Sequence, residues 1–344
     1  MNHFRGDGTN YLSVRGDEYK RLTPVYDWMK IPGATIVQLD KMPGENEIQK
    51  WGLTDYVGAV TDGTYGAVGF DFKSPHTGLA AKKAWFFFDK TYVCLGTNIS
   101  SRMKNQVLTT VNQCLLNGQV TVSDADGIHP QERGSRMKKE VRWVVHDKVG
   151  YYFLNKENVI LSNQRTEGSW KIANRQTTTP TDIIQQDVFT LSVDHGSYPN
   201  NEGYAYMVVP SADPLSIEKQ VEEEGVVVLA NCPDVQAVRH DGLNMAYAVF
   251  YKGGTLRIHD KIVVEMDAPG MLMVKYNDAG EILALGVSDP TRFMKKLHLS
   301  VNQKIVGSAQ ENIQTEWDEK QALTRITVEL PQNEYAGKSV IYNK

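Results

Sequence analysis

The hydrophobic pattern of the chain is most pronounced in one stretch, Ala81–Gly96, where bulky apolar side chains occupy consecutive positions. Four aromatic residues, Trp85–Phe88, are followed by the polar pair Asp89-Lys90 and then by a second apolar run that starts at Tyr92. Aromatic and β-branched residues on both sides of a short polar turn predict a β-hairpin. Consecutive side chains of a strand point to opposite faces, so both faces of the first strand are expected to be covered. Such a strand is typical of the inside of a large stack of sheets.

Short apolar runs separated by turn residues continue along most of the chain. Before residue 215 these turns recur roughly every ten residues, which is typical of an all-β sandwich. Only Ser216–Gly225 has the pattern of a helix, with a serine at its start, an acidic run and a glycine at its end. A second series of strand-like runs then extends from residue 226 to residue 342.

This arrangement predicts an all-β protein with two domains. The chain has 344 residues, about two domains by size, although a large sandwich can reach roughly 250 residues as one unit. We place the boundary near residue 224. Residues 1–224 are then expected to form a central sandwich domain and residues 225–344 a C-terminal sandwich domain.

Composition excludes several classes of protein. The hydrophobic share of 41% and the charged share of 23% are ordinary for a soluble globular protein. The net charge of -4 and the absence of a basic stripe give no basis for nucleic-acid binding. The apolar runs are shorter than the ~20 residues needed to cross a membrane, and residues 1–8 lack the pattern of a signal peptide. Cys94, Cys114 and Cys232 are widely spaced, which favours buried thiols over a disulfide framework or a metal site.

No local motif predicts a catalytic residue. His146-Asp147 and Asp194-His195 have the composition of a catalytic dyad, but neighbours in a strand point to opposite faces. Packing or turn roles are therefore the preferred interpretation of both pairs. The eight histidines are scattered singly, without the spacing of a zinc site. No nucleophile elbow is present.

Trp51 is the one residue that suggests ligand binding. It stands in the polar sequence Asn46–Leu53, next to Gly52, and not in an apolar run. An indole on an open loop suits stacking on the apolar face of a sugar ring. The alternative is a tryptophan that folds back to cap the sandwich, and the residues alone favour this alternative.

Several longer motifs occur in collinear order along essentially the whole chain, and AAKKAWFFFDK is the most specific of them. They are KIPG at 30–33, DGTYGA at 62–67, AAKKAWFFFDK at 80–90, TTVNQ at 109–113, LNG at 116–118, HDKVGYYF at 146–153, HGSYP at 195–199 and YAY at 204–206. Together these motifs resemble the β-domains of polysaccharide lyase family 8, which includes hyaluronate, chondroitin and xanthan lyases. The similarity to the chondroitin AC type is the strongest.

The resemblance implies a galactose-mutarotase-like super-sandwich followed by a smaller C-terminal β-sandwich. Family members cleave uronic-acid polysaccharides by β-elimination: a base removes the C5 proton next to a neutralised carboxylate, and an acid protonates the leaving oxygen. The family's Asn, His, Tyr and Arg for this reaction lie in an N-terminal α/α toroid that we expect to be absent here, so no catalytic residue is assigned. The sugar-stacking Trp of the family matches Trp51, and this match reverses the preference in favour of substrate binding.

No metal ligand is assigned, and Ca²⁺ is only weakly supported as a cofactor. Some relatives hold Ca²⁺ with acidic residues around the motif that matches Tyr26–Leu39. Asp27 keeps one acidic position, but Met29, Gln38 and Leu39 stand where other ligands would be. The resemblance therefore implies a site that is lost or weakened.

Three hypotheses of function follow. In the preferred one the chain is the β-portion of a lyase for chondroitin- or hyaluronan-like acidic polysaccharide, and is inactive alone. In the second it is a stand-alone carbohydrate-binding module that uses Trp51. In the third it docks onto a separate α/α-toroid catalytic subunit. Neither nucleic acid nor membrane is expected as a partner, and the family resemblance implies an extracellular or periplasmic location.

Overall fold

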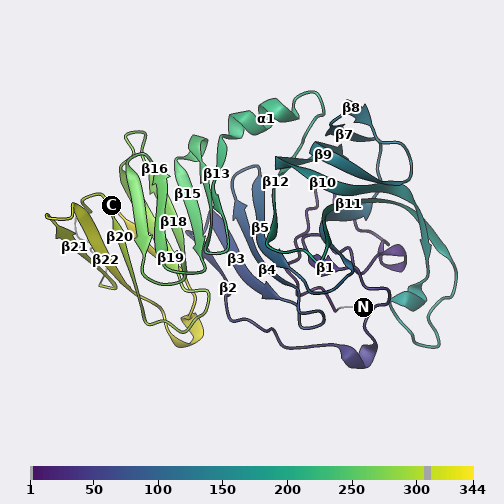
Figure 1. Cartoon of the computed structure of the whole chain (residues 1–344), viewed down its shortest axis with the longest axis horizontal. Coiled ribbons are helices and arrows are strands. Elements are labelled where there is room, and N and C mark those ends of the chain that lie inside the picture. Colours follow the sequence, from purple (N-terminus) through teal and green to yellow (C-terminus); the bar gives the residue numbers. More distant parts are fainter. Residues whose placement is uncertain (1–2, 306–310) are drawn as a thin grey trace. The chain divides into compact units, whose positions relative to one another are not determined.

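The computed structural model of the chain describes residues 3–305 and 311–344, and these are mostly β-strands (Figure 1). They form two compact units. Unit 1 comprises the chain up to Leu53 together with Phe72–Ala81 and Asn98–Ile217. Unit 2 comprises Thr54–Asp71, Lys82–Thr97 and Glu218–Lys344. The all-β prediction is confirmed.

Unit 1 contains a long antiparallel sheet with the strand order β1-β6-β11-β10-β12. A further layer of pairing joins β9 to β10, β7 to β9 and β8 to β7. Strand β10 is long enough to pair with β12 through its first residues and with β11 through its last. The strands are β1 (Thr35–Val37), β6 (Gln106–Leu115), β7 (Val120–Asp124), β8 (Gly127–Pro130), β9 (Ser135–His146), β10 (Val149–Gly168), β11 (Ile184–Ser197) and β12 (Glu202–Pro210).

The N-terminal segment of unit 1 is held by a small apolar core. Phe4, Leu22 and Ile31 are almost fully buried there, next to Ile36 of β1. The short 3-10 helices η1 (Thr23–Val25), η2 (Glu45–Glu47) and η3 (Trp170–Ile172) also belong to this unit. The loops that follow β1 therefore begin next to this buried apolar core.

The predicted hairpin is confirmed as β4 (Ala80–Phe87) and β5 (Tyr92–Ser100). Its turn is closed where the N–H of Phe88 donates to the carbonyl of Thr91 at 3.0 Å. Trp85 and Phe86 are both buried although they point to opposite faces, as expected of a strand covered on both sides. The exception is Phe87, which is 42% exposed at the end of the strand.

Unit 2 contains a sandwich of two antiparallel sheets. The six-stranded sheet has the order β13-β14-β15-β18-β19-β23, and the five-stranded sheet has the order β16-β17-β20-β22-β21. One apolar core draws side chains from both sheets, among them Leu272, Val274, Leu297 and Ile326. The strands are β13 (Val226–Asn231), β14 (Val235–His240), β15 (Met245–Phe250), β16 (Gly254–His259), β17 (Ile262–Met266), β18 (Gly270–Tyr276), β19 (Ile282–Ser288), β20 (Lys296–Val301), β21 (Ile313–Asp318), β22 (Leu323–Glu329) and β23 (Val340–Asn343), with the 3-10 helices η4 (Asp241–Leu243) and η5 (Asn333–Tyr335).

Segments from the first part of the sequence complete unit 2. The antiparallel strands β2 (Val57–Thr61) and β3 (Gly66–Lys73) contribute most of their residues to it. The hydroxyl of Tyr56 lies 3.0 Å from the carbonyl oxygen of Phe250 and 3.1 Å from that of Gly270. The hydroxyl of Tyr251 donates to the carbonyl of Lys83 at 3.1 Å. These buried contacts join residues that are far apart in sequence into one packed body.

The predicted helix is confirmed as α1 (Ile217–Glu224). It ends at Gly225, whose φ of 63° is the left-handed conformation that glycine adopts at helix C-termini. In the described part of the chain, none of the helices has the length and apolar character that crossing a membrane requires.

Candidate functional site

Trp51 stands on a loop of unit 1 and projects into solvent. Its side chain is 85% exposed, and Leu53, two residues further on, is also exposed. The indole therefore does not fold back onto the sandwich, as the alternative interpretation of the sequence required. Its large apolar face is open to a flat ligand such as a sugar ring.

A hollow of about 690 Å³ lies on the same loop, on the N-terminal side of Trp51. Its wall comes from residues between Leu39 and Gln49 and from Pro75 and His76 of the β3–β4 loop. His76 is in edge-to-face contact with the ring of Phe4, which is buried, and burial lowers the pKa of His76. The part of the hollow formed by His76 is therefore packed against a buried residue. The lining also contains a positive side chain, Lys41, and a negative side chain, Glu47.

His146 is a packing residue and not part of a dyad. Its Nε2 accepts the N–H of Asn117 at 3.0 Å, and its ring stacks on Phe189 with centroids 4.2 Å apart. Burial lowers its pKa to about 4. The neighbouring Asp147 instead pairs with Arg15 at 2.9 Å.

His195 is likewise held inside unit 1. Its Nε2 lies 2.8 Å from Oγ1 of Thr109, and the side chain is buried. The carboxylate of Asp194 accepts the N–H of Gly196 at 2.9 Å, which is a turn contact. Both adjacent pairs therefore have the packing and turn roles preferred from the sequence.

Asp27, the acidic residue that the sequence offered for a Ca²⁺ site, has both carboxylate oxygens in contact with other groups of the protein. One carboxylate oxygen of Asp27 accepts the N–H of Met29 at 3.0 Å, and the other is 2.6 Å from Nζ of Lys30. The side chain of Gln38 donates to the carbonyls of Met29 and Ile36. Over residues 3–305 and 311–344, no cluster of three or more His, Cys, Asp or Glu side chains is arranged to hold a metal ion.

None of the three cysteines forms a disulfide within the described part of the chain. Cys94 and Cys114 are buried as expected, and burial raises the pKa of Cys114. Cys232 is exposed, so the expectation of burial was wrong there. It lies in the turn between β13 and β14, where its Sγ contacts the carbonyl of Val235 at 3.5 Å.

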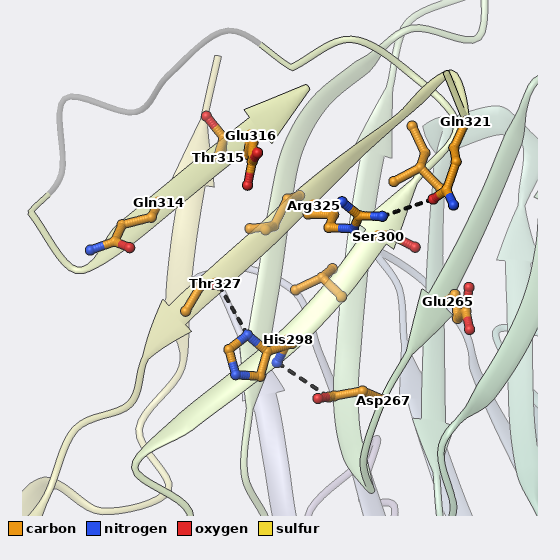
Figure 2. A pocket seen from close by; sticks show the side chains of 13 residues that line it. Glu265, Asp267, His298, Ser300, Gln314, Thr315, Glu316, Gln321, Arg325 and Thr327 are labelled. Atoms are coloured by element: carbon orange, nitrogen blue, oxygen red, sulfur yellow. Dashed lines mark hydrogen bonds between the residues drawn. The ribbon is translucent and has the colours of Figure 1, made fainter. Parts of the chain in front are cut away.

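A third region, a hollow of about 600 Å³, lies on the outer face of the five-stranded sheet of unit 2 (Figure 2). Nδ1 of His298 is 3.0 Å from Oγ1 of Thr327, and the N–H of His298 donates to the carboxylate of Asp267 at 3.2 Å. Its one arginine, Arg325, pairs with Asp318 at 3.1 Å. Three carboxylates line this hollow and disfavour an anionic ligand: Glu265, Asp267 and Glu316.

The outer-face hollow was not predicted from the sequence. Its polar residues alternate with core residues along β20, β21 and β22, which is the ordinary pattern of a sheet with one solvated face. Such a pattern carries no signal for a site. Trp51, in contrast, was identifiable because a large aromatic residue interrupts a polar segment.

Comparison with protein families matches two adjoining models. Residues 1–221 match the super-sandwich domain of polysaccharide lyase family 8, and residues 227–298 match the C-terminal β-sandwich domain of the same family.

Known relatives agree with these matches. The chain is 34% identical to a chondroitinase-AC of Pedobacter heparinus, over 99% of this chain and 46% of that protein. It is 29% identical to a hyaluronate lyase of Thermasporomyces composti, over 82% of this chain and 36% of that protein. A solved structure of a chondroitinase AC lyase, determined with oligosaccharides, superimposes with a TM-score of 0.84 at 34% identity and covers 97% of this chain and 47% of the other. The chain thus spans less than half the length of these relatives.

Proposed function

The chain belongs to polysaccharide lyase family 8, and from this premise we propose that it supplies the polysaccharide-binding β-domains of a lyase for chondroitin- or hyaluronan-like acidic chains. The reaction class is β-elimination next to a uronate carboxylate. In this proposal the β-domains hold the polysaccharide, and they do not themselves break the glycosidic bond.

The exposure of Trp51 carries the proposal. A tryptophan with 85% of its surface in water contributes little to packing, so almost the whole indole is available to a ligand. Stacking on the apolar face of a sugar ring is the contact that an indole makes best from such a position. The hollow between Leu39 and His76 is lined by the same loop as far as Gln49 and offers polar side chains to the hydroxyl groups of such a ligand.

The burial of two candidate histidines supports assigning the elimination reaction to residues other than those that the structure describes. Proton abstraction from a sugar carbon requires a base, an acid and a group that neutralises the uronate, all held together at the ligand. His146 and His195 are buried, and each has a ring nitrogen in contact with a protein group, Asn117 or Thr109. We therefore propose that the Asn, His, Tyr and Arg of this family act from an α/α toroid outside the described residues.

The location follows from the substrate class. A polysaccharide is too large to diffuse through a membrane, so an enzyme that degrades it must meet it outside the cytoplasm. We propose an extracellular or periplasmic location for the protein. Fractionation of the source cells, followed by immunodetection, tests this; recovery of the protein only with the cytoplasm would contradict it.

Calorimetry with chondroitin oligosaccharides tests the binding role. Wild-type protein is expected to bind, and Trp51→Ala is expected to bind about tenfold more weakly or worse, equivalent to ~1.4 kcal/mol. Trp170→Ala is the matched control, since Trp170 is a second tryptophan of unit 1 with partial exposure. Equal binding by wild type and Trp51→Ala, or no binding by wild type, would contradict the proposal.

A further inference from the structure

A second hollow in unit 1, of about 740 Å³, shares the β3–β4 loop with the hollow near Trp51. Pro75 and His76 of this loop line the first hollow, whereas Thr77 and Gly78 line the second. The remaining wall comes from the β5–β6 and β11–β12 loops. We call it the Tyr198 hollow, after its one aromatic residue.

Hydrogen bonds between these loops fix the shape of the Tyr198 hollow. The N–H of Ser101 donates to the carbonyl of Pro199 at 3.0 Å, and the N–H of Asn201 donates to Oγ of Ser100 at 3.0 Å. The N–H of Tyr198 donates to the carbonyl of Met103 at 3.3 Å. The β5–β6 and β11–β12 loops are thus joined along their length, so a ligand would meet a preformed surface and little ordering would be needed.

The β3–β4 loop is also internally closed. The N–H of Ser74 donates to the carbonyl of Leu79 at 2.7 Å, and its own carbonyl accepts the N–H of Gly78 at 3.0 Å. Its Oγ accepts the N–H of Thr77 at 3.3 Å. All three walls of the hollow are therefore ordered by contacts independent of any ligand.

The charge of the Tyr198 hollow is positive. Lys73 and Arg102 line it and are both exposed. Its lining residues include no Asp or Glu, and neither cation forms an ion pair in the described part of the chain. The hollow of Figure 2 is the opposite case, because three carboxylates line it and its arginine is already paired.

Tyr198 provides an aromatic surface beside these cations. Its side chain is 59% exposed, and its backbone has a φ of 51°, a left-handed conformation that bulky residues rarely adopt. Its own N–H donates to the carbonyl of Met103, and its loop makes two further hydrogen bonds to Ser100 and Ser101. An exposed phenol ring next to two unpaired cations suits a ligand that has both an apolar ring face and a negative charge.

We propose that the Tyr198 hollow is a second sugar-binding subsite, in which Tyr198 stacks on a ring and Lys73 and Arg102 pair with its carboxylate or sulfate. The inference rests on the proposed polysaccharide-binding function and extends it. The hollow near Trp51 and the Tyr198 hollow both take lining residues from the β3–β4 loop. In this proposal a single acidic chain contacts the indole and the two cations.

Binding of hyaluronan and of chondroitin sulfate oligosaccharides at several salt concentrations tests the subsite. The double variant Lys73→Gln/Arg102→Gln is expected to bind at least tenfold more weakly than wild type and with a smaller dependence on salt, because exposed ion pairs are screened by salt. The control is Lys20→Gln/Lys139→Gln, which removes two exposed cations elsewhere in unit 1. Tyr198→Ala is expected to weaken binding, and Tyr198→Phe to preserve it.

The choice of ligand identifies the charged group. A loss with both polysaccharides assigns the uronate carboxylate, which both contain, and a loss only with chondroitin sulfate assigns the sulfate. Thermal unfolding of each variant verifies that it is folded. If Lys73→Gln/Arg102→Gln binds like its control while Trp51→Ala binds weakly, the subsite is refuted and the proposed function stands. If wild type binds neither polysaccharide, the proposed function itself fails.

Discussion

Nζ of Lys30 lies 2.6 Å from Oδ2 of Asp27, so the one acidic residue that the sequence offered for a Ca²⁺ site has its own internal cation. The other carboxylate oxygen is bound by the N–H of Met29. A divalent ion at Asp27 would have to displace Lys30. The side-chain NH₂ group of Gln38 donates to two carbonyls, which fixes the orientation of this amide. Both contacts oppose Ca²⁺ binding around Asp27.

The first prediction is that Ca²⁺ does not stabilise this protein. A ligand that binds only the folded state raises the melting temperature, and the rise grows with ligand concentration. Thermal unfolding in excess Ca²⁺ and in chelator is expected to give the same midpoint for wild type. A rise that increases with Ca²⁺ concentration would show that a site exists after all.

The second prediction concerns His146 and acid. Its pKa is about 4 in the folded protein and about 6.5 when exposed, so between these values the unfolded chain binds a proton that the folded chain does not. The contribution of His146 to the free energy of unfolding should therefore fall as the pH falls below 6.5, by roughly 2 kcal/mol at pH 5. His146→Gln keeps an acceptor for Asn117 and should lack this decrease. Denaturant titrations at about pH 7.5 and 5 measure it, and an unchanged difference in the variant would refute it.

The third prediction concerns Glu157 and has the opposite sign. Glu157 lies at a bulge where β10 changes its register with β9. Burial raises its pKa to about 7, and repulsion from Glu202 adds to this. The folded protein therefore holds a proton that the unfolded chain has lost, and this stabilisation disappears as the pH rises through 7. Glu157→Gln should increase the free energy of unfolding at pH 8 by up to about 3 kcal/mol, and much less at pH 5.

His146 and Glu157 change the free energy of unfolding in opposite directions as the pH changes, so their contributions partly cancel in the wild type. Removing His146 should reveal the dependence due to Glu157, and removing Glu157 should reveal that due to His146. Parallel pH profiles for the two single variants would contradict both assignments.

The fourth prediction is steric and concerns Gly168, at the end of β10. A Cβ at this position would lie 1.8 Å from the carbonyl oxygen of Pro24 and 2.7 Å from its carbonyl carbon, both backbone atoms of η1. Neither can move without shifting the core around Leu22, so Gly168→Ala should destabilise unit 1 by about 1–3 kcal/mol. Gly254→Ala is the control, because a Cβ there meets nothing within 4 Å. Equal melting temperatures for the two variants would exclude the close approach.

The fifth prediction tests unit 2 as one packed body. The buried hydroxyl of Tyr56 lies within hydrogen-bonding distance of two carbonyls that come after α1 in the sequence. Tyr56→Phe should lower the free energy of unfolding by about 1–2 kcal/mol, the usual effect of losing a buried hydrogen bond. Tyr335→Phe changes an exposed hydroxyl and should have no effect. If both variants unfold like wild type, Tyr56 does not tie its segment to the sandwich.

Much of the fold could be predicted because its signals are local. The hairpin at Trp85–Phe88, the helix before Gly225 and the recurrence of turns all follow from short-range chemistry. The composition of the two units could not be predicted in the same way. Residues 54–71 and 82–97 join unit 2 through contacts such as that of Tyr56 with Phe250, which are almost two hundred positions apart in the chain. The proposed boundary near residue 224 therefore separates two series of strands along the sequence, and it does not describe which segments pack together.

The candidate site, like the fold, could be predicted from the sequence only in part. Trp51 was identifiable from its neighbours, and the structure adds its exposure. The Tyr198 hollow had no sequence signal because Lys73 comes from the end of β3, and Arg102 and Tyr198 come from two separate loops. Its positive charge exists only where the fold brings two cations together without a carboxylate, and the overall net charge of -4 gives no indication of it.

The central claim is that the described residues bind acidic polysaccharide and leave its linkages intact. One measurement tests it most directly: purified protein is incubated with chondroitin at concentrations where calorimetry shows saturation, and the ultraviolet absorbance of the unsaturated uronate product is followed. We predict bound polysaccharide with no increase in absorbance. A steady increase that disappears in the Trp51→Ala variant would show that this chain carries out the elimination itself and would contradict the account.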